Sequence, residues 1–348
     1  MRTIEWCGDH VRLIDQTLLP GKLTYVEIRD VNTMIDAIRR LVVRGAPALG
    51  VAGAFGVVLS AHQIRQSGAD IGQIDVDALR LAEARPTAVN LRWGVQRMMN
   101  VIGKCNEIKE ICAMAEQEAI AILEADVKSN ERMSLRGADF VASLVKGQVS
   151  VQTHCNAGGL ACVEWGTALG VVRAIHERGM LRKVFVDETR PLLQGSRLTA
   201  FELSQMQINH TIVVDSAGPS VIAAGLVDVV LVGADRIGAN GDTANKIGTY
   251  PLALAASRAG IPFIVVAPES TVDLATISGM EIHIELRDED EVLSWNGNRV
   301  APKESSAYNP AFDITPRDLI TILCPIKIVL SSILVLRLPC MNYSELWK

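Results

Sequence analysis

Residues 148–159 read Gln-Val-Ser-Val-Gln-Thr-His-Cys-Asn-Ala-Gly-Gly, and two patterns of apolar spacing meet in this stretch. Residues 148–152 have the short apolar run of a buried strand, whereas residues 160–176 carry apolar side chains at the spacing of one helix face. A strand followed directly by a helix is the repeating unit of α/β proteins. We therefore expect a sheet whose ligands bind at the carboxyl ends of its strands.

Cys155 lies at this predicted junction between strand and helix. A helix N-terminus presents unpaired backbone N–H groups and favours negative charge, so it would lower the pKa of a thiol placed there. Such a thiol is a better acid, base or nucleophile. The alternative is that Cys155 only fills space, as buried cysteines commonly do, and its position alone does not separate the two.

The alternation of strands and helices continues from about residue 140 onward. Apolar strands are predicted at residues 149–153, 183–187, 211–215, 227–233, 262–267 and 281–286. Helices are predicted at residues 160–178, 197–206, 219–225 and 245–259. Short apolar strands that alternate with helices predict a parallel sheet covered on both faces, so this half of the chain is expected to be a doubly wound α/β domain.

The first 140 residues have a different pattern. A strand-like opening is followed by helical spacing, notably in residues 31–42 and 108–123. We expect a mixed, mostly helical N-terminal domain with a small sheet over residues 1–130, and the doubly wound domain over residues 131–322. Residues 323–348 form an aliphatic tail. Its apolar segment is shorter than the roughly 20 residues that a membrane span needs, so we interpret the tail as a buried element or an aberrant end.

The composition is that of an ordinary globular protein, with 49% hydrophobic and 21% charged residues. A net charge of −5 argues against a protein that binds nucleic acid through a basic face. The seven cysteines are scattered without zinc-binding spacing, and the N-terminus lacks the apolar stretch of a signal peptide. We expect a cytoplasmic protein with free thiols, no metal site, and no nucleic-acid or membrane partner.

Carboxylates follow several of the predicted strands. Asp187, Asp215 and Asp235 each come at or directly after a strand end, as Cys155 does. Because the carboxyl ends of parallel strands meet at one edge of a sheet, we expect these groups to converge at one crevice. The alternative for any one of them is that it caps a helix N-terminus.

Several other polar groups are placed to bind a sugar phosphate. Residues 238–248 combine three glycines with Lys246 at the predicted start of a helix, which suits a phosphate monoester but equally an exposed loop. Arg44 and Arg85 each precede a Pro-containing turn and a predicted helix, where a guanidinium either binds phosphate oxygens or only flanks the helix. Gln194 can donate to and accept from a hydroxylated ligand.

Seven short motifs occur in order along the chain. They are Arg-Gly-Ala-Pro-Ala, Arg-Pro-Thr-Ala-Val-Asn-Leu, Thr-His-Cys-Asn-Ala-Gly, Asp-Glu-Thr-Arg-Pro-x-x-Gln-Gly, Gly-Ala-Asp-Arg-Ile, Asn-Gly-Asp-x-Ala-Asn-Lys-Ile-Gly-Thr and Ala-Tyr-Asn-Pro-Ala-Phe-Asp-x-Thr-Pro. Together they resemble the methylthioribose-1-phosphate isomerase family. The resemblance implies a Rossmann-like C-terminal domain, a homodimer, and no metal or organic cofactor. It also implies a catalytic pair, Cys155 and Asp235, and substrate contacts from Arg44, Gly45, Ala46, Arg85, Gln194, Asn245 and Lys246.

The activity implied by this resemblance is the conversion of 5-methylthioribose 1-phosphate into 5-methylthioribulose 1-phosphate in methionine salvage. The phosphate locks the anomeric carbon, so the sugar ring must open before hydrogen moves from C2 to C1. Burial would raise the pKa of Asp235 and let it donate a proton to the ring oxygen. Cys155 would act beside C1 and C2, either as a proton shuttle or as the wall for a hydride shift, while Arg44, Arg85 and Lys246 hold the phosphate.

Three other functions are alternatives for the same motifs. An isomerase of 5-deoxyribose 1-phosphate would differ only in the pocket for the 5-substituent, and ribose-1,5-bisphosphate isomerases tend to have a shorter N-terminal end. The α, β and δ regulatory subunits of the translation-initiation guanine-nucleotide exchange factor share the fold, but they are interaction proteins that typically lack the Cys and Asp pair. This chain has both residues, so the isomerase is the function we expect.

Overall fold

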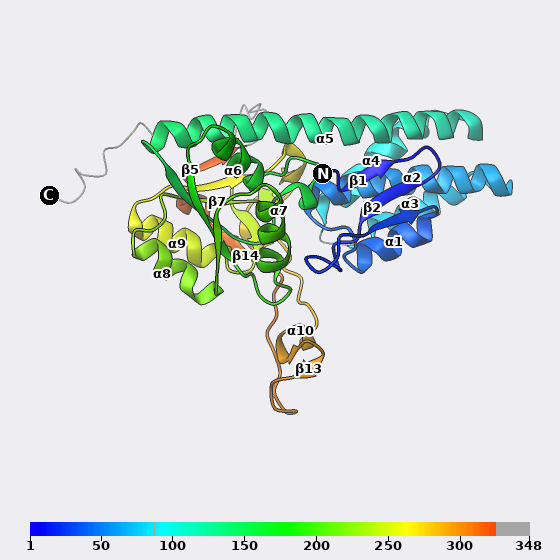
Figure 1. The fold of residues 1–348 in the computed structure, drawn as a ribbon. Coiled ribbons are helices and arrows are strands. Elements are labelled where there is room, and N and C mark those ends of the chain that lie inside the picture. Colours follow the sequence, from blue (N-terminus) through cyan, green and yellow to red (C-terminus); the bar gives the residue numbers. More distant parts are fainter. Residues whose placement is uncertain (86–87, 325–348) are drawn as a thin grey trace.

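One helix of 37 residues, α5 (Ile108–Leu144), runs along both halves of the molecule (Figure 1). The computed structural model describes residues 1–85 and 88–324. The N-terminal helices and a small sheet lie beside one part of α5, and the larger sheet lies beside the other part. The aliphatic tail predicted at residues 323–348 lies outside the described residues from residue 325 onward.

The N-terminal half contains the small sheet and the helices that its pattern predicts. An antiparallel sheet is formed by β1 (Ile4–Trp6), β2 (Val11–Ile14) and β3 (Tyr25–Ile28). The sheet is followed by α1 (Val31–Arg39), α2 (Ala46–Ser67), α3 (Gln73–Ala82) and α4 (Val89–Ile102). Helix α2 lies at the centre of this half, packed against α1, α3, α4 and α5.

Helix α2 is the one helix in residues 1–85 and 88–324 that is long and apolar enough to cross a membrane. Of its most apolar window, 83% is buried within the molecule, as in the core helix of a globular domain. Its backbone approaches α4 closely, because a Cβ added at Gly94 of α4 would lie 2.1 Å from the carbonyl oxygen of Gly50. This packing sets the positions of Arg44 and Arg85, which lie just before the two helices.

The C-terminal half contains a six-stranded parallel sheet, as predicted. Its strands, in the order β15-β10-β7-β4-β5-β6, are β4 (Val149–Thr153), β5 (Leu181–Asp187), β6 (His210–Val213), β7 (Val229–Val232), β10 (Phe263–Val266) and β15 (Ile322–Cys324). The helices of this half are α6 (Ala168–Glu177), α7 (Ala200–Gln205), α8 (Gly218–Ala223) and α9 (Thr249–Ala259).

Both faces of this sheet are buried. In β7, Val229 and Leu231 pack into the core that contains residues of α5 and α6, whereas Val230 and Val232 pack into the core that contains residues of α8 and α9. Side chains of a strand alternate between the two faces, so an unbroken apolar strand requires helices on both. This is why the short valine-rich strands could be recognised in the sequence.

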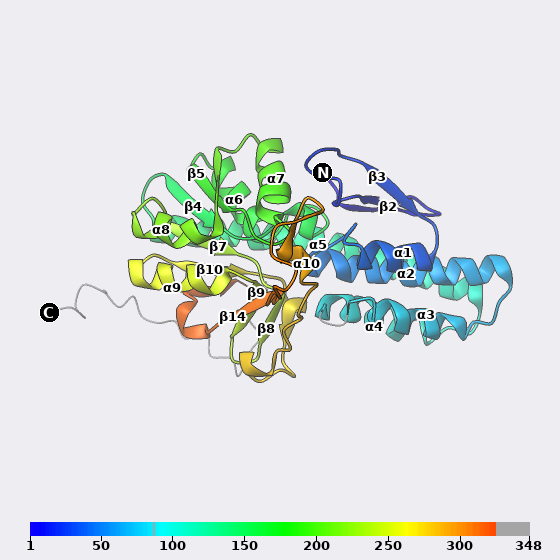
Figure 2. The same cartoon turned by 90° about the horizontal axis from the view of Figure 1, so that it is seen from below.

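A second sheet, which the sequence did not predict, follows β7 directly. Its four strands, in the order β11-β8-β9-β14, are β8 (Arg236–Gly238), β9 (Thr243–Lys246), β11 (Val272–Asp273) and β14 (Phe312–Thr315). The chain between β11 and β14 forms an arm that projects from the body in Figure 1. The arm contains α10 (Asp290–Leu293), β12 (Ser294–Trp295) and β13 (Asn298–Arg299), and Figure 2 shows the same arrangement from below.

The helix predicted at residues 160–178 is wrong at its start, because α6 begins only at Ala168. A short 3-10 turn (Gly159–Ala161) is the only regular element between β4 and α6. The intervening chain folds back on itself so closely that a Cβ at Gly166 would lie 2.5 Å from the backbone of Gly158. Apolar spacing alone did not reveal this loop, since its apolar side chains are also buried.

Two further boundaries are wrong. The helix predicted at residues 245–259 begins at Thr249, and the residues before it belong to β9. Residues 281–286, predicted as a strand, form the end of a 3-10 turn and then a chain with one isolated bridge at Leu286. Both errors concern segments that pair with distant parts of the chain.

We propose that the two domains meet within α5, near residue 130. One hydrophobic core extends as far as Leu123 of α5, with Val127 packed against it. A second core begins at Met133 of the same helix. The change from one core to the other supports the expected division at residues 1–130 and 131–322, although the helix itself continues through it.

We predict that Gly94→Ala destabilises the N-terminal half by about 1–3 kcal/mol, because the new methyl group would overlap the backbone of Gly50. Gly72→Ala is the matched control, since Gly72 has ordinary helical angles and its nearest neighbour is 3.6 Å from an added Cβ. Urea unfolding followed by circular dichroism measures both. Equal midpoints for the two variants would contradict the close approach of α2 and α4.

Candidate active site

A cavity of about 750 Å³, its open mouth included, lies between the two halves of the molecule. All nine residues to which the family resemblance gives a role line it: Arg44, Gly45, Ala46, Arg85, Cys155, Gln194, Asp235, Asn245 and Lys246. They come from the start of α2, the chain before α4, the loops that follow β4, β5 and β7, and strand β9. Residues far apart in the sequence therefore meet in one place, as the strand-end argument predicted.

The N-terminus of α2 forms one wall. Gly45 has a φ of 92°, and a Cβ there would lie 2.4 Å from Cα of Ala161, so this position requires glycine. Among the described residues no side chain caps this helix end. Arg44 is held beside it, because its Nε donates to Oε1 of Gln16 at 3.3 Å and its Nη2 donates to the carbonyl oxygen of Asn156 at 3.1 Å. A positive helix end and a guanidinium therefore face the cavity together.

Cys155 follows β4 in a left-handed conformation, with φ of 62°. Such a conformation costs a non-glycine residue about 1–3 kcal/mol and persists only where neighbours enforce it. Two threonines do so: Oγ1 of Thr189 accepts from the Cys155 N–H at 2.9 Å, and Oγ1 of Thr199 donates to the Cys155 carbonyl at 2.6 Å. The orientation of the thiol is thus set by its backbone.

The predicted lowering of the Cys155 pKa is wrong. Helix α6 begins only at Ala168, so Cys155 does not lie at its N-terminus. Burial raises the pKa of the thiol, and the attraction of the Arg44 and Lys246 cations opposes this only in part. Cys155 therefore favours the protonated form at neutral pH, and its thiolate is favoured by the nearby cations and by a hydrogen bond from the backbone of Asn156.

Asp235 lies between β7 and β8, where its N–H donates to the carbonyl oxygen of Ala244 at 2.9 Å. Burial raises the pKa of its carboxyl group, and the cations of Lys246, Arg85 and Arg44 oppose the rise. A carboxyl group with a raised pKa keeps its proton to a higher pH than an ordinary aspartate and is a better proton donor there. This is the direction of pKa change expected of Asp235.

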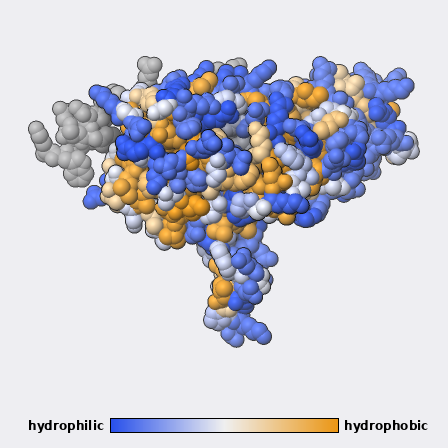
Figure 3. All heavy atoms as spheres, in the orientation of Figure 1, coloured by the Kyte–Doolittle hydropathy of each residue, from blue (hydrophilic) through white to orange (hydrophobic). Residues whose placement is uncertain are grey.

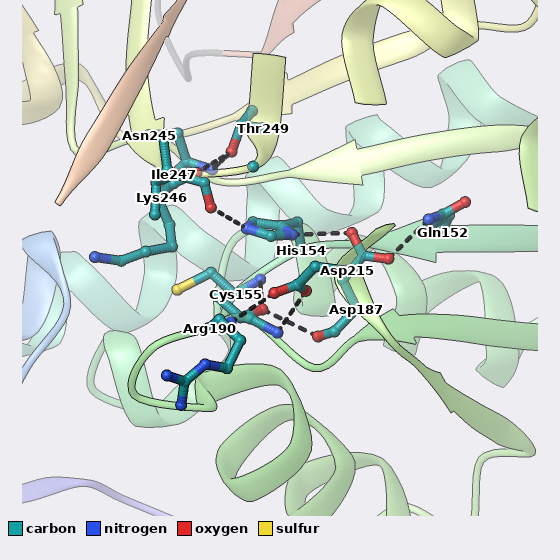
Figure 4. Close-up of polar contacts among 12 residues, drawn as sticks. Gln152, His154, Cys155, Asp187, Arg190, Asp215, Asn245, Lys246, Ile247 and Thr249 are labelled. Atoms are coloured by element: carbon teal, nitrogen blue, oxygen red, sulfur yellow. Dashed lines mark hydrogen bonds and ion pairs between the residues drawn. The ribbon is translucent and has the colours of Figure 1, made fainter. Parts of the chain in front are cut away.

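Lys246 is at the end of β9, where it pairs with Phe312 of β14. Its Nζ donates to the carbonyl oxygen of Ala311 at 2.7 Å and lies 4.9 Å from the centre of the Phe312 ring. Burial lowers the pKa of Lys246, while Cys155 and Asp235 act against the decrease. Figure 4 shows the side chains of Lys246 and Cys155 pointing to the same side.

The phosphate cradle predicted at residues 238–248 is not formed. Residues 239–242 are the turn between β8 and β9, where the Gly238 N–H donates to the Asp242 carbonyl at 2.9 Å. The N-terminus of α9 is also occupied, because Asp313 accepts from the N–H groups of Gly248 at 2.8 Å and Tyr250 at 3.1 Å. Of this loop, only Asn245 and Lys246 line the cavity.

Gln194 is a buried polar residue that the protein itself leaves incompletely paired. Within residues 1–85 and 88–324, its Oε1 atom has no hydrogen-bond partner. A buried polar atom without a partner costs free energy, so an unpaired acceptor in a cavity indicates that a ligand supplies the donor.

Arg85 is opposite in charge to Asp235. Burial lowers the pKa of the Arg85 guanidinium, and the negative charges of Glu285 and Asp235 oppose this decrease.

Asp187 and Asp215 do not line the cavity, contrary to the prediction that all strand-end carboxylates converge there. Asp215 accepts from the backbone N–H groups of Thr189 at 2.7 Å and Arg190 at 2.6 Å, and so fixes that loop (Figure 4). Asp187 pairs with His154. Both carboxylates therefore fix residues of the cavity wall or of the loop beside it without lining the cavity themselves.

Sequence reasoning missed several residues of the cavity wall. Arg287, from the base of the arm, forms ion pairs with Glu285 and Glu291. Asn156 and Thr167 also line the cavity, beside His154. A signal existed for His154 and Asn156, which flank Cys155, but none existed for Arg287, whose arm carries no recognisable pattern.

The fold and the site define an α/β protein with a parallel sheet, whose cavity is lined by the cationic side chains of Arg44, Arg85, Lys246 and Arg287. The model of the Initiation factor 2 subunit family matches residues 42–325, and the chain belongs to this family.

Individual relatives confirm the resemblance noted in the sequence. Methylthioribose-1-phosphate isomerases of Fervidobacterium nodosum and Heliobacterium modesticaldum are 46% and 48% identical over 323 and 327 residues, which is 92% of this chain and 91% and 93% of theirs. The crystal structure of 5-methylthioribose 1-phosphate isomerase from Pyrococcus horikoshii superposes with a TM-score of 0.84 at 42% identity, covering 93% of this chain and 91% of that one. A structure from A. fulgidus, described as subunit delta of the translation initiation factor eIF-2B, has a TM-score of 0.79 at 42% identity and covers 94% of each chain.

We predict that Lys246→Met slows the alkylation of Cys155 by iodoacetamide several-fold at mildly alkaline pH, because the variant loses a cation that favours the thiolate. Lys104→Met, on an exposed loop, is the control. Mass spectrometry of the Cys155 peptide separates this cysteine from the others. An unchanged rate in Lys246→Met would contradict the coupling between the two side chains.

Proposed function

We propose that the protein is an aldose-ketose isomerase that converts 5-methylthioribose 1-phosphate into 5-methylthioribulose 1-phosphate, a step of methionine salvage. The observation that carries the proposal is the placement of Asp235 and Cys155, both with raised pKa, on the wall of a cavity that four cationic side chains, Arg44, Arg85, Lys246 and Arg287, also line. The relatives named above have this activity in their names and match nearly the whole chain.

Asp235 would open the sugar ring. The bond between C1 and the ring oxygen breaks as that oxygen takes the Asp235 proton, which leaves C1 electron-poor. Hydrogen then moves from C2 to C1, and the C2 hydroxyl proton returns to Asp235 as the ketone forms. Every atom is retained, and the carboxyl group ends in its starting state, so no external acid or oxidant is consumed.

Cys155 would act where hydrogen moves between C2 and C1. In one alternative its thiolate removes the C2 hydrogen as a proton and returns it to C1. In the other, hydrogen moves directly as hydride, and the thiol forms a water-excluding wall beside it. The raised pKa of Cys155 suits the second alternative directly, whereas the first requires Arg44 and Lys246 to stabilise the thiolate.

The phosphate would bind at the uncapped N-terminus of α2, with Gly45 and Ala46 presenting backbone N–H groups and Arg44, Arg85 and Lys246 supplying charge. Helix N-termini bind phosphate through these groups and the helix dipole. Gln194 and Asn245 remain for the sugar hydroxyls. Free thiols among the described cysteines support a cytoplasmic location for this chemistry.

We predict that Cys155→Ser and Asp235→Asn each lower kcat by about 10²–10⁴-fold on 5-methylthioribose 1-phosphate, as expected for loss of a proton-transferring group. Exposed Cys7→Ser and Asp139→Asn are matched controls and should retain wild-type turnover. A coupled assay that detects the ketose product measures the turnover of all four variants. Near-normal turnover of either site variant would refute its assigned role.

The same assay, run with 5-deoxyribose 1-phosphate and ribose 1,5-bisphosphate, separates the related isomerases from one another. The preferred substrate should be the methylthio sugar. Absence of turnover on all three would favour the non-enzymatic regulatory subunit, a function suggested by the A. fulgidus neighbour.

We also propose that the chain forms a homodimer through the face formed by β6, α8 and α9. Figure 3 shows apolar side chains gathered over α8 and α9. The exposed apolar residues of this face are Ile212, Val214, Leu226, Tyr250 and Leu254. Apolar patches of this kind on a globular protein mark interaction surfaces, and β6 is an edge strand that a second copy would cover.

Light scattering after size-exclusion chromatography should therefore give about twice the chain mass of 37.6 kDa. The double variant Ile212→Glu with Leu254→Glu should give the monomer mass, because two buried charges oppose association. Leu79→Glu, equally apolar and exposed but on α3, is the control. A dimer that survives the double variant would place the interface elsewhere.

A further inference from the structure

The ring of His154 is buried between two hydrogen-bond acceptors. Its Nδ1 lies 2.9 Å from Oδ2 of Asp187, and its Nε2 lies 2.8 Å from the carbonyl oxygen of Ile247 (Figure 4). A carbonyl oxygen only accepts hydrogen bonds, and an ionised carboxylate does the same. Both ring nitrogens must therefore carry hydrogen if both contacts are hydrogen bonds to an ionised Asp187, which makes the ring an imidazolium.

The charges around the ring favour this form. Three carboxyl groups face it from three elements: Asp187 at the end of β5, Asp215 after β6, and Asp313 on β14. Burial raises the pKa of Asp187 and of Asp313, and the charge of His154 opposes that rise in both. Burial opposes the ring's charge, but the hydrogen bond and attraction of Asp187, with Asp215, outweigh it and raise the pKa of His154. The other titratable groups nearby are Cys155, next in the chain, and Lys246, which directly precedes Ile247.

A bound cation is the other way to satisfy such a cluster, since ligand atoms of His154, Asp187 and Asp215 lie within 4.8 Å of one another. The hydrogen bonds argue against it. Both nitrogens of His154 are engaged, and the two oxygens of Asp215 accept from the backbone of Thr189 and Arg190. A ring that donates from both nitrogens has no lone pair left to bind a metal. The second ring proton then supplies the positive charge that a metal ion would otherwise supply.

The ring joins three elements of the fold. His154 follows β4, Asp187 ends β5, and Ile247 follows β9, which belongs to the other sheet. The ring also fills its site completely, because a Cβ at Gly248 would lie 2.7 Å from it. The end of the Cys155 strand is thereby tied to the end of the Lys246 strand.

We propose that His154 is a positioning residue, present as a buried imidazolium, that holds Cys155 and Lys246 at a fixed separation across the cavity. The consequence for catalysis rests on the isomerase function proposed above, whereas the charge state of the ring does not. The ring touches Asp187 and Ile247 and acts through the residues beside them.

A pH dependence follows from the two acceptors. Because the pKa of His154 is raised, the stabilising link is complete below the ordinary histidine pKa near 6.5 and is lost as pH rises through the higher folded value. Loss of one hydrogen leaves a ring lone pair facing an acceptor oxygen, so the segment that carries Lys246 is released. Turnover should therefore fall on the alkaline side.

The charge state is tested by ¹H–¹⁵N NMR of the protein labelled at its six histidines. Above the ordinary histidine pKa near 6.5, where the other rings become neutral, one ring should still show two protonated nitrogens. That signal should be absent in His154→Gln, should become neutral in Asp187→Asn, and should remain in His176→Gln, an exposed control. Six neutral rings in the wild-type protein would overturn the proposal.

The positioning role is tested by kinetics. His154→Gln should lower kcat by about 10²-fold, the effect of displacing a reacting group by about 1 Å, and should change KM less, because the wall at α2 is intact. The fall in turnover at alkaline pH, which we assign to His154 in the wild-type protein, should be absent from this variant. Unchanged kcat and an unchanged pH profile would overturn the role.

Two further outcomes are decisive. If His154→Gln does not fold, Asp187→Asn, which retains the shape of the side chain but not its charge, takes its place in both measurements. If the wild-type protein turns over none of the sugar phosphates, the isomerase function fails, while the NMR spectrum still decides whether His154 is a buried imidazolium.

Discussion

The site depends on the burial of several ionisable side chains around one cavity. Burial lowers the pKa of Lys246 and raises those of Asp235 and Cys155, so one cause moves all three toward their neutral forms. The charge of Lys246 opposes the rise in the pKa of Asp235 and Cys155, and these two groups oppose the fall in the pKa of Lys246. Burying an ion costs several kcal/mol, and the packed cores of both halves of the molecule hold these groups against their tendency to remain hydrated.

The location of the site could be predicted from the sequence because it follows from topology. Cys155 and Asp235 each follow an apolar strand, and parallel strands bring their carboxyl ends to one edge. The element that carries Lys246 could not be predicted, since β9 is a strand through its pairing with β8 and with β14, about residue 312, and Lys246 itself pairs with Phe312 of β14. A local pattern gives no sign of a partner so distant in the chain.

The electrostatics of the site were predicted in part. Burial of Asp235 was inferred from its proposed task, and the raised pKa agrees with it. The direction for Cys155 was wrong because a dipole was expected from a helix that begins only at Ala168. His154 stood in a recognised motif without an assigned role, and only the structure shows that Asp187 and Ile247 occupy its two nitrogens.

Helix α5 has a consequence for how a substrate reaches the cavity. At 1.5 Å per residue its 37 residues extend roughly 55 Å, and both cores include residues from it. The two halves cannot slide apart along this axis without breaking the hydrogen bonds of the helix. Their relative motion is thereby limited to twisting or bending of this one helix, so access to the cavity depends on these two motions.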